Sequence, residues 1–169
     1  MKNLLLMRHG AAHSAPSSKQ RDHDRPLSPH GREEVLAIAK HLAHNGTIPD
    51  IILTSSATRC IQTGETIVKS LDYSGEVQSR SELYLASPET YLTAVRQLHD
   101  EWSTALIIGH NPAVQEFAHA IQNKGVAPGS FVSASITCIS LAISSWKMTA
   151  LHMGNCLWFT KPGESGFLR

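Results

Sequence analysis

Three short apolar runs, each bounded by polar or turn-forming residues, most strongly constrain how this chain can fold. They comprise residues 3–7, Ile51 to Leu53 and Ala105 to Ile108. Runs of this length are typical of buried strands, most often in a parallel sheet. Each is followed, at once or after a loop, by a segment with helical periodicity. This alternation predicts an α/β fold.

The helical segments have recognisable starts. Ser28-Pro29, Ser87-Pro88 and Asn111-Pro112 each place a capping residue before a proline suited to the first helical position. Ser55-Ser56 opens a further helix directly after the second apolar run. Within each of these segments apolar residues recur on one face, so all four helices are predicted to pack against the sheet.

The C-terminal third is rich in Ser, Thr, Ile and Trp and lacks a helical period. Two late strands are therefore predicted, over Ser133 to Leu141 and about Ser145 to His152, as a hairpin at an edge of the sheet. The stretch from Ala11 to Arg25 is polar and rich in Ser and Pro, which predicts a mobile loop beside the site.

Length and charge exclude several classes of protein. A chain of 169 residues is expected to form a single domain over 1–169. A net charge of +1 gives no overall field for nucleic acid or an anionic membrane, so phosphate binding would be local. The N-terminal apolar stretch is too short for a signal peptide or a span, which favours a cytoplasmic location. The three widely spaced cysteines suggest neither disulfides nor a zinc ribbon.

Arginine and histidine side chains stand where the three apolar runs end. Arg8, His9 and Gly10 follow the first run, Arg59 lies in the first turn of the helix after the second, and His110 follows the third. In α/β sheets these ends share one edge, where ligands bind and helix N-termini favour anions. A neutral imidazole at His9 would be a suitable nucleophile for phosphoryl transfer, and the cationic groups would stabilise the phosphoryl oxygens. Gly10 would let the backbone approach the phosphate closely.

Four motifs occur in a characteristic order: Arg8-His9-Gly10, Arg25-Pro26-Leu27-Ser28-x-x-Gly31, Ser55-Ser56-x-x-Arg59-x-x-Gln62-Thr63 and Gly109-His110-Asn111-Pro112. Together they resemble the histidine phosphatase superfamily, and within it the short SixA-type phosphohistidine phosphatases. The resemblance runs from residue 3 to about 120. It implies a phosphoglycerate mutase-like fold, a three-layer α/β/α sandwich with a mostly parallel central sheet, and a metal-independent hydrolase that needs no cofactor.

The resemblance also implies a role for each matching residue. His9 would be phosphorylated, Arg8 and Arg59 would bind the phosphoryl oxygens, and His110 would complete the pocket from the opposite side. Arg25 corresponds to a further phosphate-contacting arginine of the SixA-type branch. A surface residue before a turn is the alternative interpretation of Arg25.

The proton donor for the leaving group is the least defined part of the predicted site. Larger members of the superfamily carry a glutamate after the third strand, and Glu82 occupies about that place, although its flanking residues differ. Asp22, His23 and Asp24 in the loop are alternatives. A phosphohistidine leaving group has only a modest need of an acid, because the imidazole nitrogen can be protonated before or during departure.

The sequence therefore predicts a phosphatase with a phosphohistidine intermediate on His9, acting on phosphohistidine in a signalling protein. The alternative in the same fold is a phosphomonoesterase for a small phosphate ester, such as a sugar or terpenoid phosphate. Outside this class stand a phosphate-binding module without turnover and a metal-binding protein. The metal-binding hypothesis would use His13, His23, His30, His41 and His44. The spacing of these histidines offers no third ligand in register. We expect a monomer with neither a nucleic acid nor a membrane partner.

Overall fold

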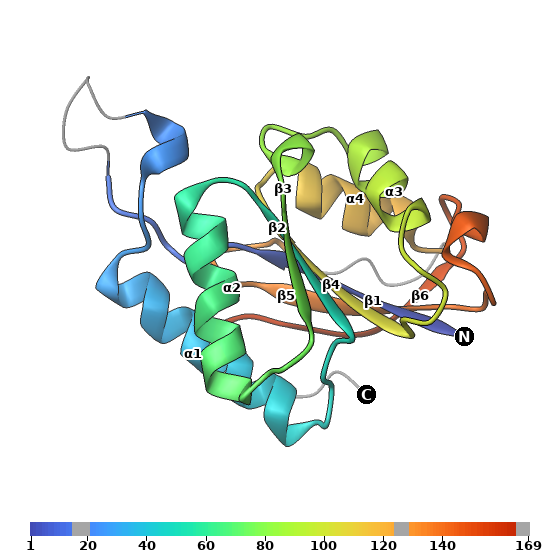
Figure 1. The fold of residues 1–169 in the computed structure, drawn as a ribbon, viewed down its shortest axis with the longest axis horizontal. Helices are drawn as coiled ribbons and strands as arrows, with labels where there is room; N and C mark the ends of the chain where they lie inside the picture. The colour runs from blue at the N-terminus through green and yellow to red at the C-terminus, as the bar shows by residue number, and fades with distance from the viewer. Residues whose placement is uncertain (15–20, 124–128, 165–169) are drawn as a thin grey trace.

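The computed structural model describes residues 1–14, 21–123 and 129–164. Within these residues six strands form one sheet in the order β3-β2-β4-β1-β5-β6. The strands are β1 (Lys2–Arg8), β2 (Ile51–Ser55), β3 (Glu76–Arg80), β4 (Thr104–Gly109), β5 (Ile136–Leu141) and β6 (Gly154–Thr160). The first four are parallel to one another, whereas β5 runs antiparallel to β1, and β6 runs antiparallel to β5 (Figure 1).

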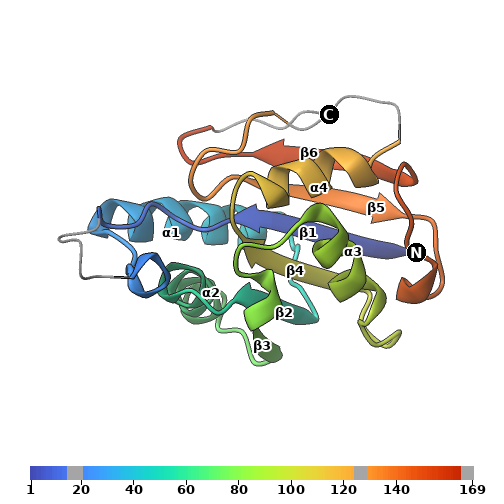
Figure 2. The same ribbon diagram turned by 90° about the horizontal axis from the view of Figure 1, so that it is seen from above.

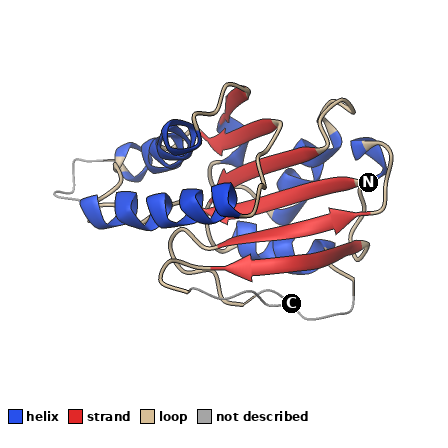
Figure 3. Ribbon diagram, turned by 90° about the horizontal axis from the view of Figure 1, so that it is seen from below, coloured by secondary structure: helices blue, strands red, loops and turns tan. Residues whose placement is uncertain are grey.

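Helices cover both faces of the sheet. They are α1 (Pro29–His44), α2 (Thr58–Leu71), α3 (Pro88–Arg96) and α4 (Ala113–Ile121). Figures 1 and 3 show α1 and α2 on one face and α3 and α4 on the other. This arrangement confirms the predicted three-layer α/β/α sandwich with a mostly parallel sheet.

The central strand β1 is apolar from Leu4 to Met7, and its place in the fold explains this run. Leu4 and Leu6 point into the core under α3 and α4, while Leu5 and Met7 point into the core under α1 and α2. All four side chains are fully buried. Because successive side chains of a strand point to opposite faces, a strand between two helical layers must be apolar at every position.

Two of the four predicted helix starts are confirmed, and two are displaced. The hydroxyls of Ser28 and Ser87 accept hydrogen bonds from the backbone N–H groups of their own first turns. By contrast, α2 begins at Thr58, because Ser55 still pairs with β3 as the last residue of β2. Helix α4 begins at Ala113, since the amide of Asn111 donates to the carbonyl of Phe131 instead of capping the helix.

The late hairpin lies at the sheet edge as predicted, but its second strand was predicted too early. That strand is β6, and the region expected to be a strand contains a single 3-10 turn, Trp146–Met148. The indole of Trp146 is fully buried and donates to the carbonyl of Trp102, which anchors this turn to the segment before β4. The first strand starts at Ile136, because Ala134 has a positive φ of 55° that ends the extended conformation before it.

The fold brings the ends of β1, β2 and β4 together. Arg8 lies opposite Gly109 at the carboxyl ends of β1 and β4, and Thr54 of β2 lies opposite Ile108. The neighbouring ends of these strands are visible in Figure 2. Residues 15–20 of the predicted mobile loop lie outside the described residues. None of the helices in the described ranges has the length and apolarity needed to cross a membrane.

Candidate active site

His9 follows β1 directly, and its backbone continues the sheet through a 3.1 Å hydrogen bond to the carbonyl of Gly109. Its side-chain Nδ1 lies 2.7 Å from the carbonyl oxygen of Gly10. A carbonyl only accepts, so Nδ1 carries the proton and Nε2 carries the lone pair. Burial, aided by the charges of Arg59 and Arg8 and opposed by the Gly10 hydrogen bond, lowers the pKa of His9 to about 4. At neutral pH the ring is therefore uncharged, with the lone pair of Nε2 directed to the Nε of Arg59.

Arg59 lies in the first turn of α2 and is only 6% exposed. Its Nε donates to Nε2 of His9 at 3.2 Å, and Nη2 donates to Nδ1 of His110 at 3.2 Å. A guanidinium at this end of a helix opposes the helix dipole unless an anion is present. Its burial between two imidazoles therefore indicates an anion site.

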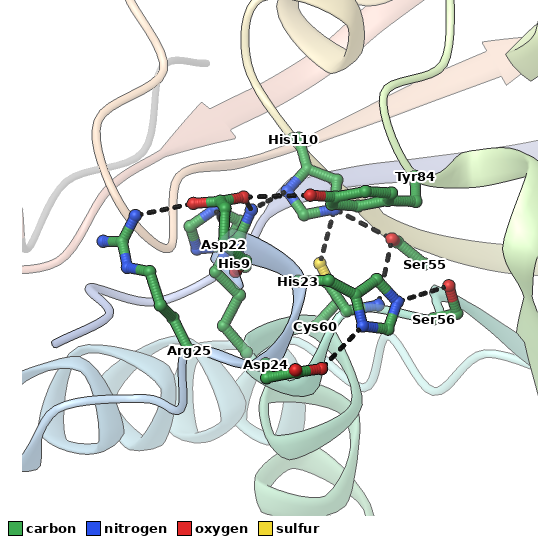
Figure 4. A network of polar contacts seen from close by, with 12 residues as sticks. His9, Asp22, His23, Asp24, Arg25, Ser55, Ser56, Cys60, Tyr84 and His110 are labelled. Atoms are coloured by element: carbon green, nitrogen blue, oxygen red, sulfur yellow. Dashed lines mark hydrogen bonds and ion pairs between the residues drawn. The ribbon is translucent and has the colours of Figure 1, made fainter. Parts of the chain in front are cut away.

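His110 completes the cluster from the loop after β4. Its Nδ1 accepts from Arg59, so Nε2 carries the proton and donates to the hydroxyl of Ser55 at 2.8 Å. Burial, followed by the charges of His9 and Arg59, lowers the pKa of His110 to about 3. The His9 and His110 rings meet edge to face at 5.1 Å between centroids, as Figure 4 shows for the labelled residues.

Arg8 approaches the site from the end of β1. Its Nη1 donates to the carbonyl of Phe131 at 2.9 Å, and its Nε is buried without a hydrogen-bond partner among the described residues. Burial lowers the pKa of Arg8, and the nearby carboxylate of Glu34 opposes this effect. Arginine nevertheless stays charged in proteins. The unpartnered N–H is a donor suited to a phosphoryl oxygen.

Arg25 reaches the cluster through Asp22. The Arg25 Nη1 donates to one Asp22 carboxylate oxygen at 2.7 Å, and Arg59 Nη2 donates to the other at 2.9 Å. Burial would raise the pKa of Asp22, but the hydrogen bonds from the two arginines outweigh it and lower that pKa to about 2. The structure thus places Arg25 beside the predicted site rather than on a separate surface.

Gly10 serves packing here. A Cβ at this position would lie 2.6 Å from the carbonyl oxygen of Gly31 and 2.8 Å from a methyl of Val35, so only glycine lets the chain pass against α1. The Gly10 N–H donates to the hydroxyl of Thr63 and thus does not face an open phosphate pocket. Gln62, the neighbour of Thr63 in the motif, accepts from the N–H of Leu27 at 2.8 Å. The motif residues around Arg59 therefore hold two loops at the site.

Glu82 is not among the residues that the structure brings together. Its carboxylate lies 3.5 Å from Arg80, and its side chain lines a hollow beside α3. Tyr84, two residues later, points into the cluster instead: its hydroxyl donates to Asp22 at 3.2 Å and its ring contacts His110 (Figure 4). Sequence reasoning missed Tyr84, because the edge strand β3 that precedes it has no apolar run to mark it in the sequence.

Two of the histidines proposed as metal ligands, His23 and His30, have separate partners. His30 Nε2 lies 3.3 Å from Glu34, and His23 contacts Asp24 and Ser56. Across the described ranges, no three or more His, Cys, Asp or Glu side chains are grouped so as to hold a metal ion.

A half-buried imidazole, a buried imidazole and a buried arginine lie together at the carboxyl edge of a mostly parallel sheet, which makes this cluster a candidate anion site. The family model described as histidine phosphatase superfamily (branch 1) matches residues 4–84. An uncharacterised protein of Mycobacterium tuberculosis is 33% identical over 112 residues, which are 66% of this chain and 67% of that protein. The chain belongs to the histidine phosphatase superfamily. This membership supports the expectation of a hydrolase.

Further likenesses extend over most of the chain. An uncharacterised Mycobacterium leprae protein is 32% identical over 107 residues, 62% of each chain, so the chain spans about two thirds of the length of such relatives. Two solved structures are 26% identical, with TM-scores of 0.84 and 0.82. Both are assigned as phosphohistidine phosphatase SixA, from Nakamurella multipartitia and Agrobacterium tumefaciens, and the match covers 96% of this chain and 97% and 99% of theirs.

A more distant structure shares the fold alone. It is a mycobacterial glucosyl-3-phosphoglycerate phosphatase, 16% identical, with a TM-score of 0.68 over 92% of this chain and 96% of that one. The predicted phosphoglycerate mutase-like architecture is confirmed by these likenesses.

Proposed function

We propose that the chain is a phosphatase that transfers a phosphoryl group to Nε2 of His9 and then to water. The observation that carries this proposal is the hydrogen bond from His9 Nδ1 to the Gly10 carbonyl. It leaves the lone pair on Nε2, the nitrogen that lies 3.2 Å from Arg59. A nucleophile held by one group and aimed at an anion-binding donor has the arrangement that covalent phosphoryl transfer needs.

In the first step the lone pair of Nε2 forms a bond to phosphorus while the bond from phosphorus to the leaving group breaks. The leaving group takes the electron pair of the broken bond and a proton from solvent, and the second step returns a proton to solvent. The phosphorylated ring is an imidazolium, and the Gly10 carbonyl stabilises it by accepting from Nδ1–H. The Arg59 Nε, released from Nε2, then donates to a phosphoryl oxygen.

In the second step water attacks phosphorus and the bond between Nε2 and phosphorus breaks. Nε2 recovers its lone pair, the water loses a proton, and inorganic phosphate leaves. Arg8, Arg59 and His110 would donate to the phosphoryl oxygens in both steps. For His110 this needs a proton at Nδ1 or a turn of the ring, because in this structure Nδ1 accepts from Arg59.

We further propose phosphohistidine on a protein as the substrate. Its support is the 26% identity to two proteins assigned as SixA and the modest acid requirement of an imidazole leaving group. The fold is also that of a phosphatase for a small phosphate ester. Measuring kcat/KM with a phosphohistidine protein and with a panel of sugar and terpenoid phosphates separates the two. A large preference for a metabolite would reject the protein substrate.

Trapping of the phosphoenzyme tests the nucleophile. Protein mixed with labelled phosphohistidine substrate and denatured in alkali should retain label that acid releases, as expected of a phosphoramidate. His9→Asn should retain none. His13→Ala is the matched control, because His13 is exposed and contacts Arg25 only through its backbone carbonyl. Equal labelling or equal turnover in His9→Asn would show that another residue is the nucleophile.

A further inference from the structure

The carboxylate of Asp22 is held where donors from three separate elements converge. Arg59 of α2 and Tyr84, which follows β3, donate to its Oδ2, at 2.9 Å and 3.2 Å. Arg25 donates to its Oδ1 at 2.7 Å. Figure 4 shows Asp22 between Arg25 and Tyr84, beside His9. An anionic group that bridges arginines next to the nucleophile has the contacts expected of a phosphoryl group.

Arg59 has little capacity left for a substrate while Asp22 is in place. Its Nε donates to His9, its Nη2 to His110 and to the Asp22 carboxylate, and its Nη1 to the Asp22 carbonyl at 2.6 Å. Four of the five N–H groups of a guanidinium are thereby engaged. Binding of a phosphoryl group by the Nη2 of Arg59, in addition to its Nε, therefore requires the contact between Nη2 and the Asp22 carboxylate to open.

We propose that Asp22 is an internal occupant of the phosphoryl site, which the phosphoryl group of the substrate must displace before it can be transferred. This inference rests on the proposed function, since it takes Arg59 and His9 as the phosphoryl site. It assigns to Asp22 the role of an autoinhibitory contact, distinct from that of a proton donor.

Displacement is feasible because the Asp22 side chain is 49% exposed and can turn toward solvent. A doubly charged phosphoryl group offers three oxygens to the same donors, against two oxygens and one charge from the carboxylate. The free energy needed to move the Asp22 carboxylate away from Arg59 is the same whichever anion binds. The apparent affinity for every anion is therefore the intrinsic affinity multiplied by the fraction of molecules in which the carboxylate has moved away. Asp22 remains ionised at neutral pH, because the two arginines hold its pKa low.

A positioning role for Asp22 makes the opposite prediction. If the carboxylate served mainly to orient Arg59, its removal would weaken anion binding, because the guanidinium would lose its fixed geometry. If the carboxylate is an occupant, its removal strengthens anion binding. The sign of the change in affinity therefore decides between the two roles.

The experiment is calorimetric titration of the full chain with tungstate, a phosphate analogue, for the wild type, Asp22→Asn and Asp24→Asn. Asp24 is the matched control, since it lies in the same 3-10 turn and its carboxylate contacts His23 at 3.2 Å. We expect Asp22→Asn to bind tungstate between about threefold and about thirtyfold more tightly, from the loss of two partly exposed ion pairs. Asp24→Asn should differ from the wild type by about twofold or less.

Unchanged or weaker binding by Asp22→Asn would overturn the inference, as would an equal gain in Asp24→Asn, which would show a general effect of charge. A crystal structure with tungstate gives a second, independent test. The Asp22 carboxylate should have left Arg59 in the complex, and tungstate bound with that contact intact would overturn the inference. Failure of the proposed function is distinguishable, because it appears as the absence of label trapped on His9, whereas the inference on Asp22 is decided by the affinities for tungstate.

Discussion

The backbone N–H of Gly10 donates to the hydroxyl of Thr63, 3.2 Å away on α2. The same hydroxyl donates to the carbonyl of Arg59, one turn earlier in the helix, at 2.7 Å. Thr63 is fully buried, so water does not compete for these contacts. A single side chain thus joins Gly10, which follows His9, to Arg59.

Thr63→Val should destabilise the fold and slow the reaction. Valine has nearly the same shape but leaves the buried Gly10 N–H without an acceptor, which costs about 1–3 kcal/mol. The free energy of unfolding, measured with urea, should fall by that amount, and kcat should fall because His9 and Arg59 are no longer joined. Thr63→Ser, which keeps the hydroxyl, is the control. Equal losses in both variants would show that the methyl group, and not the hydrogen bond, matters.

The lowered pKa of His9 predicts activity in weakly acidic solution. The ordinary pKa of histidine is 6.5, whereas burial first and neighbouring arginines second place that of His9 at about 4. The nucleophile must be neutral, so the reactivity of Nε2 should persist as the pH falls through 6 and disappear near 4. NMR titration of ¹³C-labelled histidine, with His9→Asn to assign the signal, measures this pKa. A midpoint near 6.5 in the folded protein would contradict the buried geometry.

The two site histidines also predict a pH-dependent stability. His9 and His110 have pKa values of about 4 and about 3 in the folded chain, both below the unfolded value of 6.5. Between these values the unfolded chain binds more protons, so the free energy of unfolding should decrease as the pH falls from about 6.5 toward 4. Urea midpoints measured at pH 7.5, 6 and 5 test this. His9→Asn should show a shallower decrease, and an equal slope would contradict the prediction.

The layers of the fold and the principal site residues could be predicted from the sequence, because both depend on the local pattern of apolar and polar residues. Buried parallel strands need continuous apolar runs, and the carboxyl ends of such strands meet at one edge. The sequence therefore predicts that four side chains lie close together, namely those of Arg8, His9, Arg59 and His110. Strand β3 lacked this signal because it lies at the sheet edge, where Val77 is 46% exposed.

The remaining site contacts depend on distant parts of the chain and had no local signal. Asp22 meets Arg59 across 37 residues and Tyr84 across 62. Asn111 had the pattern of a helix cap, yet its amide bonds to Phe131, 20 residues later. A polar side chain of this kind can bond either to its own neighbours in the sequence or to a distant segment that only the complete fold brings close. The sequence pattern shows the local partner alone, so it predicts the local hydrogen bond.

Arg59 and Arg25 should differ in their sensitivity to lysine substitution. Arg59 is nearly buried and uses the fork of its guanidinium on two histidines, a geometry that an ammonium group cannot reproduce. Arg59→Lys should therefore lower kcat/KM about a hundredfold or more. Arg25→Lys, at a more exposed side chain, should cost about tenfold at most. Steady-state kinetics with one substrate compares them, and an equal loss would give Arg25 a larger role than its contacts indicate.

Glu82→Gln should leave the departure of the leaving group unchanged. An acid catalyst matters most for a leaving group of high pKa, so its loss slows an alkyl phosphate far more than a nitrophenyl phosphate. The Glu82 carboxylate lies 3.5 Å from Arg80 and lines a hollow beside α3, away from His9 and His110. We therefore expect kcat/KM for both substrates to stay within about twofold of the wild type, as for an exposed ion pair. Glu76→Gln, at the start of the edge strand β3 that precedes Glu82, is the matched control. A selective loss on the alkyl phosphate would instead identify Glu82 as the proton donor, because only a group that protonates the leaving oxygen distinguishes the two substrates.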